Sequence, residues 1–172
     1  AGFSWYGGTP SAGLDAKQGN NANSFQLFSA GGLEFVFLHL ECNAPDAVLQ
    51  WADGVLAEHA SRRAIVASHM GLGPVLQPQK PEDFFAAPKG RMQWKKVHGS
   101  LGNTPQQMWD KCFRRHANLF LILSGDQSRT QALRRVSQND AGGPVHEVLS
   151  DYMATAGTQD CWLRICRFLP AE

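Results

Sequence analysis

The sequence predicts an α/β fold in which buried strands alternate with two helices. Short runs rich in Val, Ile, Leu and Phe occur at 33–41, 63–68 and 118–124, and such runs are typical of strands buried on both faces of a sheet. Between them, apolar residues recur at helical spacing over 46–59 and from residue 105 onward. Because a strand, helix, strand order favours parallel pairing through a right-handed crossover, we expect a mostly parallel core sheet.

The first part of the chain predicts a loop, a hairpin and a helix. Residues 1–23 are rich in Gly, Asn, Ser and Ala and are expected to form a long loop. A Gly-Gly pair separates the strands expected at 24–29 and 33–41, which is typical of a tight turn. Pro45 and Asp46 then mark a helix start, since proline suits the first turn and an acid suits the positive end of the helix dipole.

The middle of the chain predicts a strand, a long loop and a second helix. The strand at 63–68 ends at His69, after which residues 70–103 are dominated by Gly, Pro, Lys and Gln without a sustained period. Loops of this length inside a domain are usually functional, so this one is expected to lie near a site. Thr104 and Pro105 open the next helix, which leads into the buried strand at 118–124.

The C-terminal part predicts antiparallel β structure, with strands at 131–137, 145–152 and 162–168. Residues 1–172 are therefore expected to be one domain, or part of one. The four cysteines form no Cys-x-x-Cys pair and no zinc knuckle, and buried free thiols are the expected state.

Composition limits the classes of function. Hydrophobic residues make up 43% of the 172 residues and charged residues 18%, which is enough for a packed core. The formal net charge of +1 favours neither a nucleic-acid binder nor a membrane-surface protein. No apolar run reaches the roughly 18 residues of a spanning helix. The sequence also lacks a phosphate-binding glycine loop, a dinucleotide fingerprint and a Gly-x-Ser-x-Gly elbow.

Two polar strand ends are the first candidates for chemistry. His69 follows one predicted parallel strand, and Asp126 follows another. Ligands of open α/β sheets gather at the carboxyl ends of such strands, where the loops converge. Imidazole and carboxylate both bind divalent ions. A single strand-end histidine is more often structural, but a second polar strand end on a neighbouring strand strengthens the ligand interpretation.

A series of segments occurs in a recognisable order, namely Gly32–Glu41, Trp51–Asp53, Ile65–His69, Trp109–Ser124 with its following Gly-x turn, Gly143–Tyr152 and Trp162–Arg164. This series resembles the second half of calcineurin-like metallophosphoesterases, and its closing stretch is similar to the terminal strands of secreted bacterial members. The resemblance implies two packed β-sheets flanked by helices. It also implies two metal ions that polarise a phosphate ester and activate a water molecule.

By this resemblance, His69 falls on the family's later lone histidine, and Gly125 begins its final Gly-His-x-His motif. Asp126 and Ser128 stand where the two histidines of that motif are expected, with Gln127 between them. The resemblance makes His69 and Asp126 the candidate metal ligands, and it does not distinguish Mn, Fe, Zn and Mg. The family's early Asp-x-His and Gly-Asn-His motifs are absent.

Other residues could support such a site. His39 and Glu41 lie two apart on a strand and therefore share a face, where they could orient metal ligands, although a structural hydrogen-bonded pair is the alternative. Lys95 belongs to a small basic and aromatic loop that could hold an anionic substrate, and a solvated face is the alternative. His98 and His116 are expected to be surface or capping residues.

The leading hypothesis is a metal-dependent hydrolase of phosphate esters. The ligands missing here would come from an N-terminal half of the domain or from a second chain, so this chain alone is expected to be inactive. Such a half-domain should pair with its missing half or form a homo-oligomer, because it exposes an apolar face or edge. A secreted or periplasmic location follows from the resemblance alone. The alternative hypothesis is a non-catalytic binding or interaction module that keeps the scaffold with a degenerate site.

Overall fold

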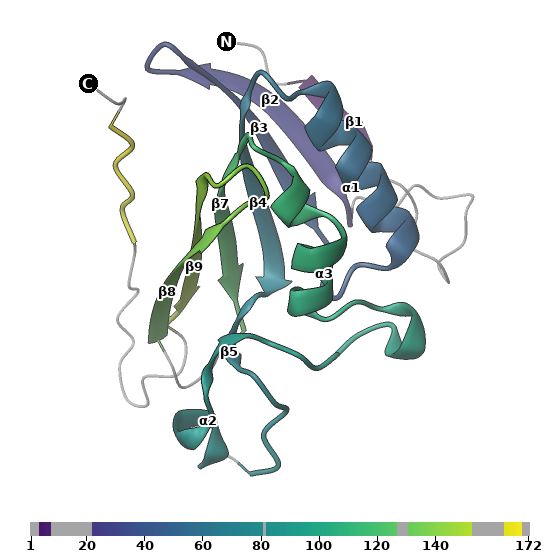
Figure 1. The fold of residues 1–172 in the computed structure, drawn as a ribbon, viewed down its shortest axis with the longest axis vertical. Helices are drawn as coiled ribbons and strands as arrows, with labels where there is room; N and C mark the ends of the chain where they lie inside the picture. The colour runs from purple at the N-terminus through teal and green to yellow at the C-terminus, as the bar shows by residue number, and fades with distance from the viewer. Residues whose placement is uncertain (1–3, 8–21, 81, 127–130, 153–163, 170–172) are drawn as a thin grey trace.

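The computed structural model describes residues 4–7, 22–80, 82–126, 131–152 and 164–169 (Figure 1). The strands of its large sheet are β1 (Ser4–Gly7), β2 (Ser24–Ala30), β3 (Leu33–Leu40), β4 (Arg63–Met70), β7 (Leu119–Gly125), β8 (Gln131–Gln138) and β9 (Pro144–Asp151). The other elements are the strands β5 (Leu72–Pro74) and β6 (Lys89–Arg91), the helices α1 (Asp46–Glu58), α2 (Asp83–Ala86) and α3 (Pro105–Lys111), and the short 3₁₀ turns η1 (Gly99–Leu101) and η2 (Phe113–Arg115).

The described residues form one seven-stranded sheet in the order β1-β2-β3-β4-β7-β9-β8, and β5 pairs with β6 as a separate ribbon. The neighbours β3, β4, β7 and β9 pair in parallel, while β1, β2 and β8 are antiparallel to their neighbours. The α/β prediction is confirmed. The antiparallel section expected at the C-terminal end is present as the β8–β9 pair, and β9 also joins the parallel core by pairing with β7.

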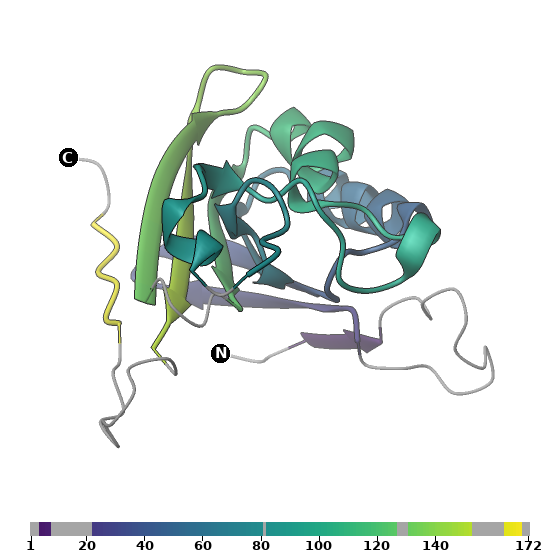
Figure 2. The ribbon, with the colours of Figure 1, turned by 90° about the horizontal axis from the view of Figure 1, so that it is seen from below.

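The helices α1 and α3 cover one face of the sheet (Figure 2). Helix α1 buries the apolar stripe that its sequence predicts, including Val48, Ala52 and Leu56, against β3 and β4. Helix α3 begins with a capping box in which Thr104 and Gln107 each bond the other's backbone amide. It buries Met108 and Trp109 in the same core.

The opposite face of the sheet carries a second, smaller apolar cluster. Its buried centre is Phe35, Ile65 and Leu121, which come from β3, β4 and β7. Phe168, from the C-terminal stretch 164–169, stacks at an angle against Phe35. No helix among the described residues covers this face, since the core contacts of α1 and α3 lie on the other one.

Three sequence expectations about loops and strands change. The predicted loop 1–23 contains β1, which extends the sheet by pairing with β2, and most of that range lies outside the described residues. The predicted loop 70–103 contains β5, α2, β6 and η1, because backbone pairing between Leu72–Pro74 and Lys89–Arg91 closes a ribbon. Residues 164–169 of the expected last strand have no regular secondary structure.

None of the helices among the described residues has the length and apolar character needed to cross a bilayer.

Candidate functional site at the carboxyl edge of the parallel strands

His69 and Asp126 lie side by side at the carboxyl edge of the sheet. His69 is near the end of β4, and Asp126 follows β7, which pairs with β4 in parallel. The distance from His69 Nε2 to Asp126 Oδ2 is 3.3 Å. The expectation that the two strand ends meet at one edge therefore holds.

The ends of β4 and β7 can come close because the residue that follows β4, Gly71, has no side chain. A Cβ added to Gly71 would lie 2.7 Å from Ser124 Oγ, closer than a real Cβ is found. Glycine at this position lets the backbone that follows His69 run directly beside β7. The contact between the two site residues thus depends on a residue without a side chain.

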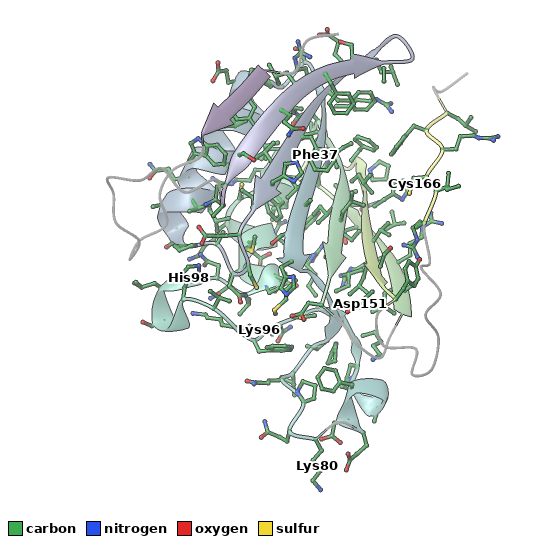
Figure 3. All side chains as sticks on the ribbon, turned by 180° about the vertical axis from the view of Figure 1, so that it is seen from behind. Phe37, Lys80, Lys96, His98, Asp151 and Cys166 are labelled. Carbon is green, nitrogen blue, oxygen red and sulfur yellow. The ribbon has the colours of Figure 1, made fainter. Side chains whose placement is uncertain are left out.

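Lys96 adds a positive charge to the same carboxylate. Its Nζ lies 2.6 Å from Asp126 Oδ2, the oxygen that also faces His69. Figure 3 shows Lys96 and His98 near the ends of the strands, where the segment 70–103 folds back over the edge of the sheet. The side chain of Asp126 is 18% exposed and that of His69 is 56% exposed, so the pair is accessible from one side.

A second carboxylate, Glu41, lies at the end of β3 and is held by two partners. His98 Nε2 is 2.8 Å from Glu41 Oε2, and Asn23 Nδ2 donates to Glu41 Oε1 at 2.8 Å. Asn23 also accepts the Glu41 backbone amide. The carboxylate is therefore fixed on both oxygens.

Asn43 fastens the segment 70–103 to the strand edge. Its Oδ1 accepts the backbone amides of Lys96 and Val97 at 2.8 and 3.1 Å, and its Nδ2 donates to the carbonyl of Asn103. Asn103 Nδ2 donates in return to the carbonyl of Ala44. Both asparagines are buried. These bonds hold Lys96 in register with Asp126.

The backbone around this edge is unusual. Among the described residues, the non-glycine positions with positive φ are Asn43, His98 and Asp126, at 54°, 63° and 55°. Asn and Asp tolerate this left-handed region better than other residues with a Cβ. Such conformations cluster at functional sites, where the surrounding structure holds them in place. All three lie within this one cluster of side chains.

The charged groups of the site shift the pKa of the Cys42 thiol. Burial raises its pKa, the carboxylates of Asp126 and Glu41 raise it further, and the ammonium of Lys96 lowers it. Its Sγ lies 3.5 Å from Asn43 Oδ1. The site is thus a partly buried place where two carboxylates are only partly offset by one lysine.

Several predicted residues lie elsewhere. His39 stacks on Phe37 with ring centroids 4.5 Å apart, and burial lowers its pKa, so it belongs to the far-face cluster and is not paired with Glu41. Lys95 Nζ donates to the carbonyl of Ser100 and lines a separate pocket with Asp46. Gln127 and Ser128 lie outside the described residues.

The sequence interpretation did not predict the contacts of two residues of the site. Lys96 belongs with Lys95 to the predicted basic and aromatic loop, and it contacts Asp126, while Lys95 contacts Ser100 instead. His98 was expected to be a surface or capping residue. It is the N-cap residue of η1, its side chain is 17% exposed and it bonds Glu41. Both contacts depend on the bonds of Asn43 and on a left-handed residue, and no periodic pattern predicts them.

The spacing of His69 and Asp126 fits one divalent ion. Ligand bonds of about 2.0–2.2 Å place two ligand atoms of the same ion roughly 3–3.5 Å apart, and the observed separation is 3.3 Å. One nitrogen and one carboxylate oxygen suit Mn, Fe, Zn or Mg. These two residues are an incomplete ligand set, and Lys96 contacts the same oxygen of Asp126 that an ion beside His69 would need.

Comparisons with known proteins give little functional information. No protein-family model matches the sequence, and no solved structure matches it. The chain is similar to uncharacterized protein YvnB of Bacillus subtilis (strain 168), with 22% identity over 155 residues, and the match covers 87% of this chain. These residues cover 10% of YvnB, so the chain spans about a tenth of the length of that relative.

Proposed function

We propose that this chain is the C-terminal portion of a calcineurin-like metallophosphoesterase domain and supplies His69 and Asp126 as ligands to a two-metal site that hydrolyses phosphate esters. The observation that carries the proposal is the 3.3 Å contact between these side chains across two parallel strands. Carboxyl ends of parallel strands are the usual place for such sites. The cluster of left-handed residues at the same edge supports it further.

Each residue of the edge has a defined role in this proposal. His69 and Asp126 would hold a divalent ion, which when bound polarises the phosphoryl group and lowers the pKa of a water ligand. Lys96, 2.6 Å from Asp126, would turn its ammonium toward the phosphate oxygens of the substrate. Glu41 and His98 would orient the groups around them without touching the ion.

The rest of the ligand set lies outside this chain in the proposal. The bridging aspartate, the asparagine ligand and the histidine beside it belong to motifs that the sequence lacks. An N-terminal half of the domain, or a second chain, would bring them to the carboxyl edge. The chain by itself would then bind metal weakly and hydrolyse nothing.

A second candidate function rests on the Lys96–Asp126 ion pair. A lysine ammonium 2.6 Å from the carboxylate already supplies a positive charge where a metal would sit. In this alternative the site has lost its ions, and the chain acts as a non-catalytic binding module on the same scaffold. The two functions predict different metal affinities when the ammonium of Lys96 is removed.

Titration of the purified chain with Mn²⁺ distinguishes the hydrolase from the binding module. Binding is measured by calorimetry and by the electron paramagnetic resonance signal of free Mn²⁺. Mn²⁺ prefers oxygen and nitrogen ligands over thiolates, so it reports this site. The hydrolase proposal expects weak binding that falls roughly tenfold or more in His69→Ala and in Asp126→Asn. It expects stronger binding in Lys96→Met, because the competing cation is gone.

Matched controls are His59→Ala and Asp83→Asn, which change the histidine that follows α1 and the aspartate that begins α2. Equal Mn²⁺ affinity in all the variants, or no binding even in Lys96→Met, would remove the metal claim and leave the binding module. The activity test is hydrolysis of bis(nitrophenyl) phosphate with added Mn²⁺ by a version of the chain extended upstream. That activity should be lost in its Asp126→Asn variant.

A further inference from the structure

A separate group of metal-ligating side chains lies near the amino end of β7, away from the carboxyl-edge site. Asp53 comes from the middle of α1, Cys112 directly follows α3 as its C-cap residue, and His116 follows η2. Their ligand atoms all lie within 4.8 Å of one another. The proposed function uses none of these residues.

The geometry points to a second metal site here, in which Asp53, Cys112 and His116 hold one zinc-like ion with water as the fourth ligand. A thiolate, an imidazole and a carboxylate are the three protein ligand types that Zn²⁺ takes in tetrahedral sites. A mixed set that includes a thiolate disfavours Mg²⁺ and Ca²⁺. The inference does not depend on the proposed phosphoesterase activity.

Local structure brings the three ligands together. Cys112 and His116 are four residues apart, and the single 3₁₀ turn of η2 between them puts both on the side that faces α1. His116 Nε2 lies 2.9 Å from Asp53 Oδ1, a separation that two ligands of one ion can share. The ligands come from segments 63 residues apart, so an ion would tie α1 to the end of α3.

The three side chains lie at a mostly buried place that opens to solvent at Asp53. Cys112 is fully buried, the His116 side chain is 10% exposed, and Asp53 is 37% exposed and leaves a way in from solvent. An ion bound here would take the place of the thiol proton of Cys112.

Arg115 is the competing cation. Its Nη2 lies 3.4 Å from Asp53 Oδ1, and its side chain is 54% exposed. An exposed arginine can swing into solvent when an ion binds, whereas a purely structural Asp53–His116 pair would lose stability without it. Removal of the Arg115 charge should therefore strengthen metal binding if the three side chains hold an ion. If Asp53 and His116 form only a structural pair, the same change should lower the stability of the chain.

Titration of the chain with Co²⁺ tests the site, because a thiolate ligand gives a charge-transfer band in the near ultraviolet and tetrahedral Co²⁺ gives strong visible bands. Both are expected, and Zn²⁺ should displace the Co²⁺. Cys112→Ser should abolish the charge-transfer band, and His116→Gln should weaken binding roughly tenfold or more. Arg115→Gln should bind Co²⁺ more tightly than the parent chain.

The controls separate this site from other thiols and from unfolding. A variant with serine at Cys42, Cys161 and Cys166 keeps Cys112 alone and should retain both bands. Circular dichroism checks that Cys112→Ser and His116→Gln are folded, and His69→Ala should leave the Co²⁺ spectrum unchanged. The proposal is overturned if the variant with Cys112 alone shows no charge-transfer band, or if Arg115→Gln binds no better than the parent.

Discussion

Asn43 is the residue that joins the strand edge to the segment folded over it. It bonds two backbone amides and one carbonyl while it is buried and in the left-handed region. Asn43→Ala leaves these groups unpaired and adds the cost of a left-handed alanine, so unfolding should become easier by about 3 kcal/mol. Thermal denaturation should show a Tm lower by roughly 6–12 °C.

The Asn43→Asp variant is the control, because aspartate keeps the two acceptor bonds and tolerates the same backbone conformation. It should lose clearly less stability than Asn43→Ala. If both variants fall equally, the amide bonds to Lys96 and Val97 do not carry the effect.

The Cys42 thiol gives a chemical measure of the charges around Asp126. The Asp126 carboxylate raises the pKa of this thiol and Lys96 lowers it. A raised pKa means less thiolate and slower alkylation at a given pH. Asp126→Asn should therefore speed the reaction of Cys42 with iodoacetamide at pH 8, and Lys96→Met should slow it, as followed by mass spectrometry of the Cys42 peptide.

An unchanged rate in both variants would show that burial alone sets the reactivity of Cys42, and changes of the same sign would contradict opposite effects of the two charges. The alkylation rate of the exposed Cys166 serves as the internal reference, since it lies outside the site.

At the scale of elements, a buried ion pair fastens the β5–β6 ribbon to the sheet. Arg91, on β6, makes two bonds of 2.8 Å to Glu147 on β9, and its guanidinium lies 3.9 Å from the centre of the Trp109 ring. Ser137 bonds both charged groups. The side chains of Arg91 and Glu147 are 5% and 4% exposed.

Removal of one partner should be far more damaging than removal of both. Glu147→Ala leaves a buried guanidinium without its counter-ion and should cost about 3–5 kcal/mol of unfolding free energy, measured by urea denaturation. The double variant Arg91→Met with Glu147→Leu should recover much of that loss. The exposed pair Arg114–Asp140 is the control, and Arg114→Ala should cost less than about 1 kcal/mol.

At the scale of the whole molecule, the two faces of the sheet differ in how they are covered. Both long helices pack on one face, and the other carries an apolar pocket lined by residues such as Phe28, Leu33 and Phe168. The proposed missing half of the domain would cover this second face. Without it, the chain should associate with itself or with an upstream fragment.

Light scattering across a concentration series measures this association. The mass should rise with concentration, and Phe168→Ser, which removes the ring that packs on Phe35 and Phe120, should increase the rise. A monomer at every concentration, with or without Phe168, would contradict the half-domain hypothesis.

The sequence alone determined the elements whose signals are local. The buried strand at 118–124, the helix that Pro45 and Asp46 begin and the Thr104 capping signal all lie where periodicity and capping placed them, within one or two residues. The meeting of His69 and Asp126 followed as well, because carboxyl ends of adjacent parallel strands share an edge.

Only the tertiary structure decided which other side chains join that edge. Lys96 and not Lys95 reaches Asp126, because the buried amide of Asn43 fixes the register of a segment with no period of its own. The Asp53, Cys112 and His116 group depends on the packing of α1 against α3. Contacts between residues distant in sequence depend on how the elements pack, and the spacing within one segment carries no information about that packing.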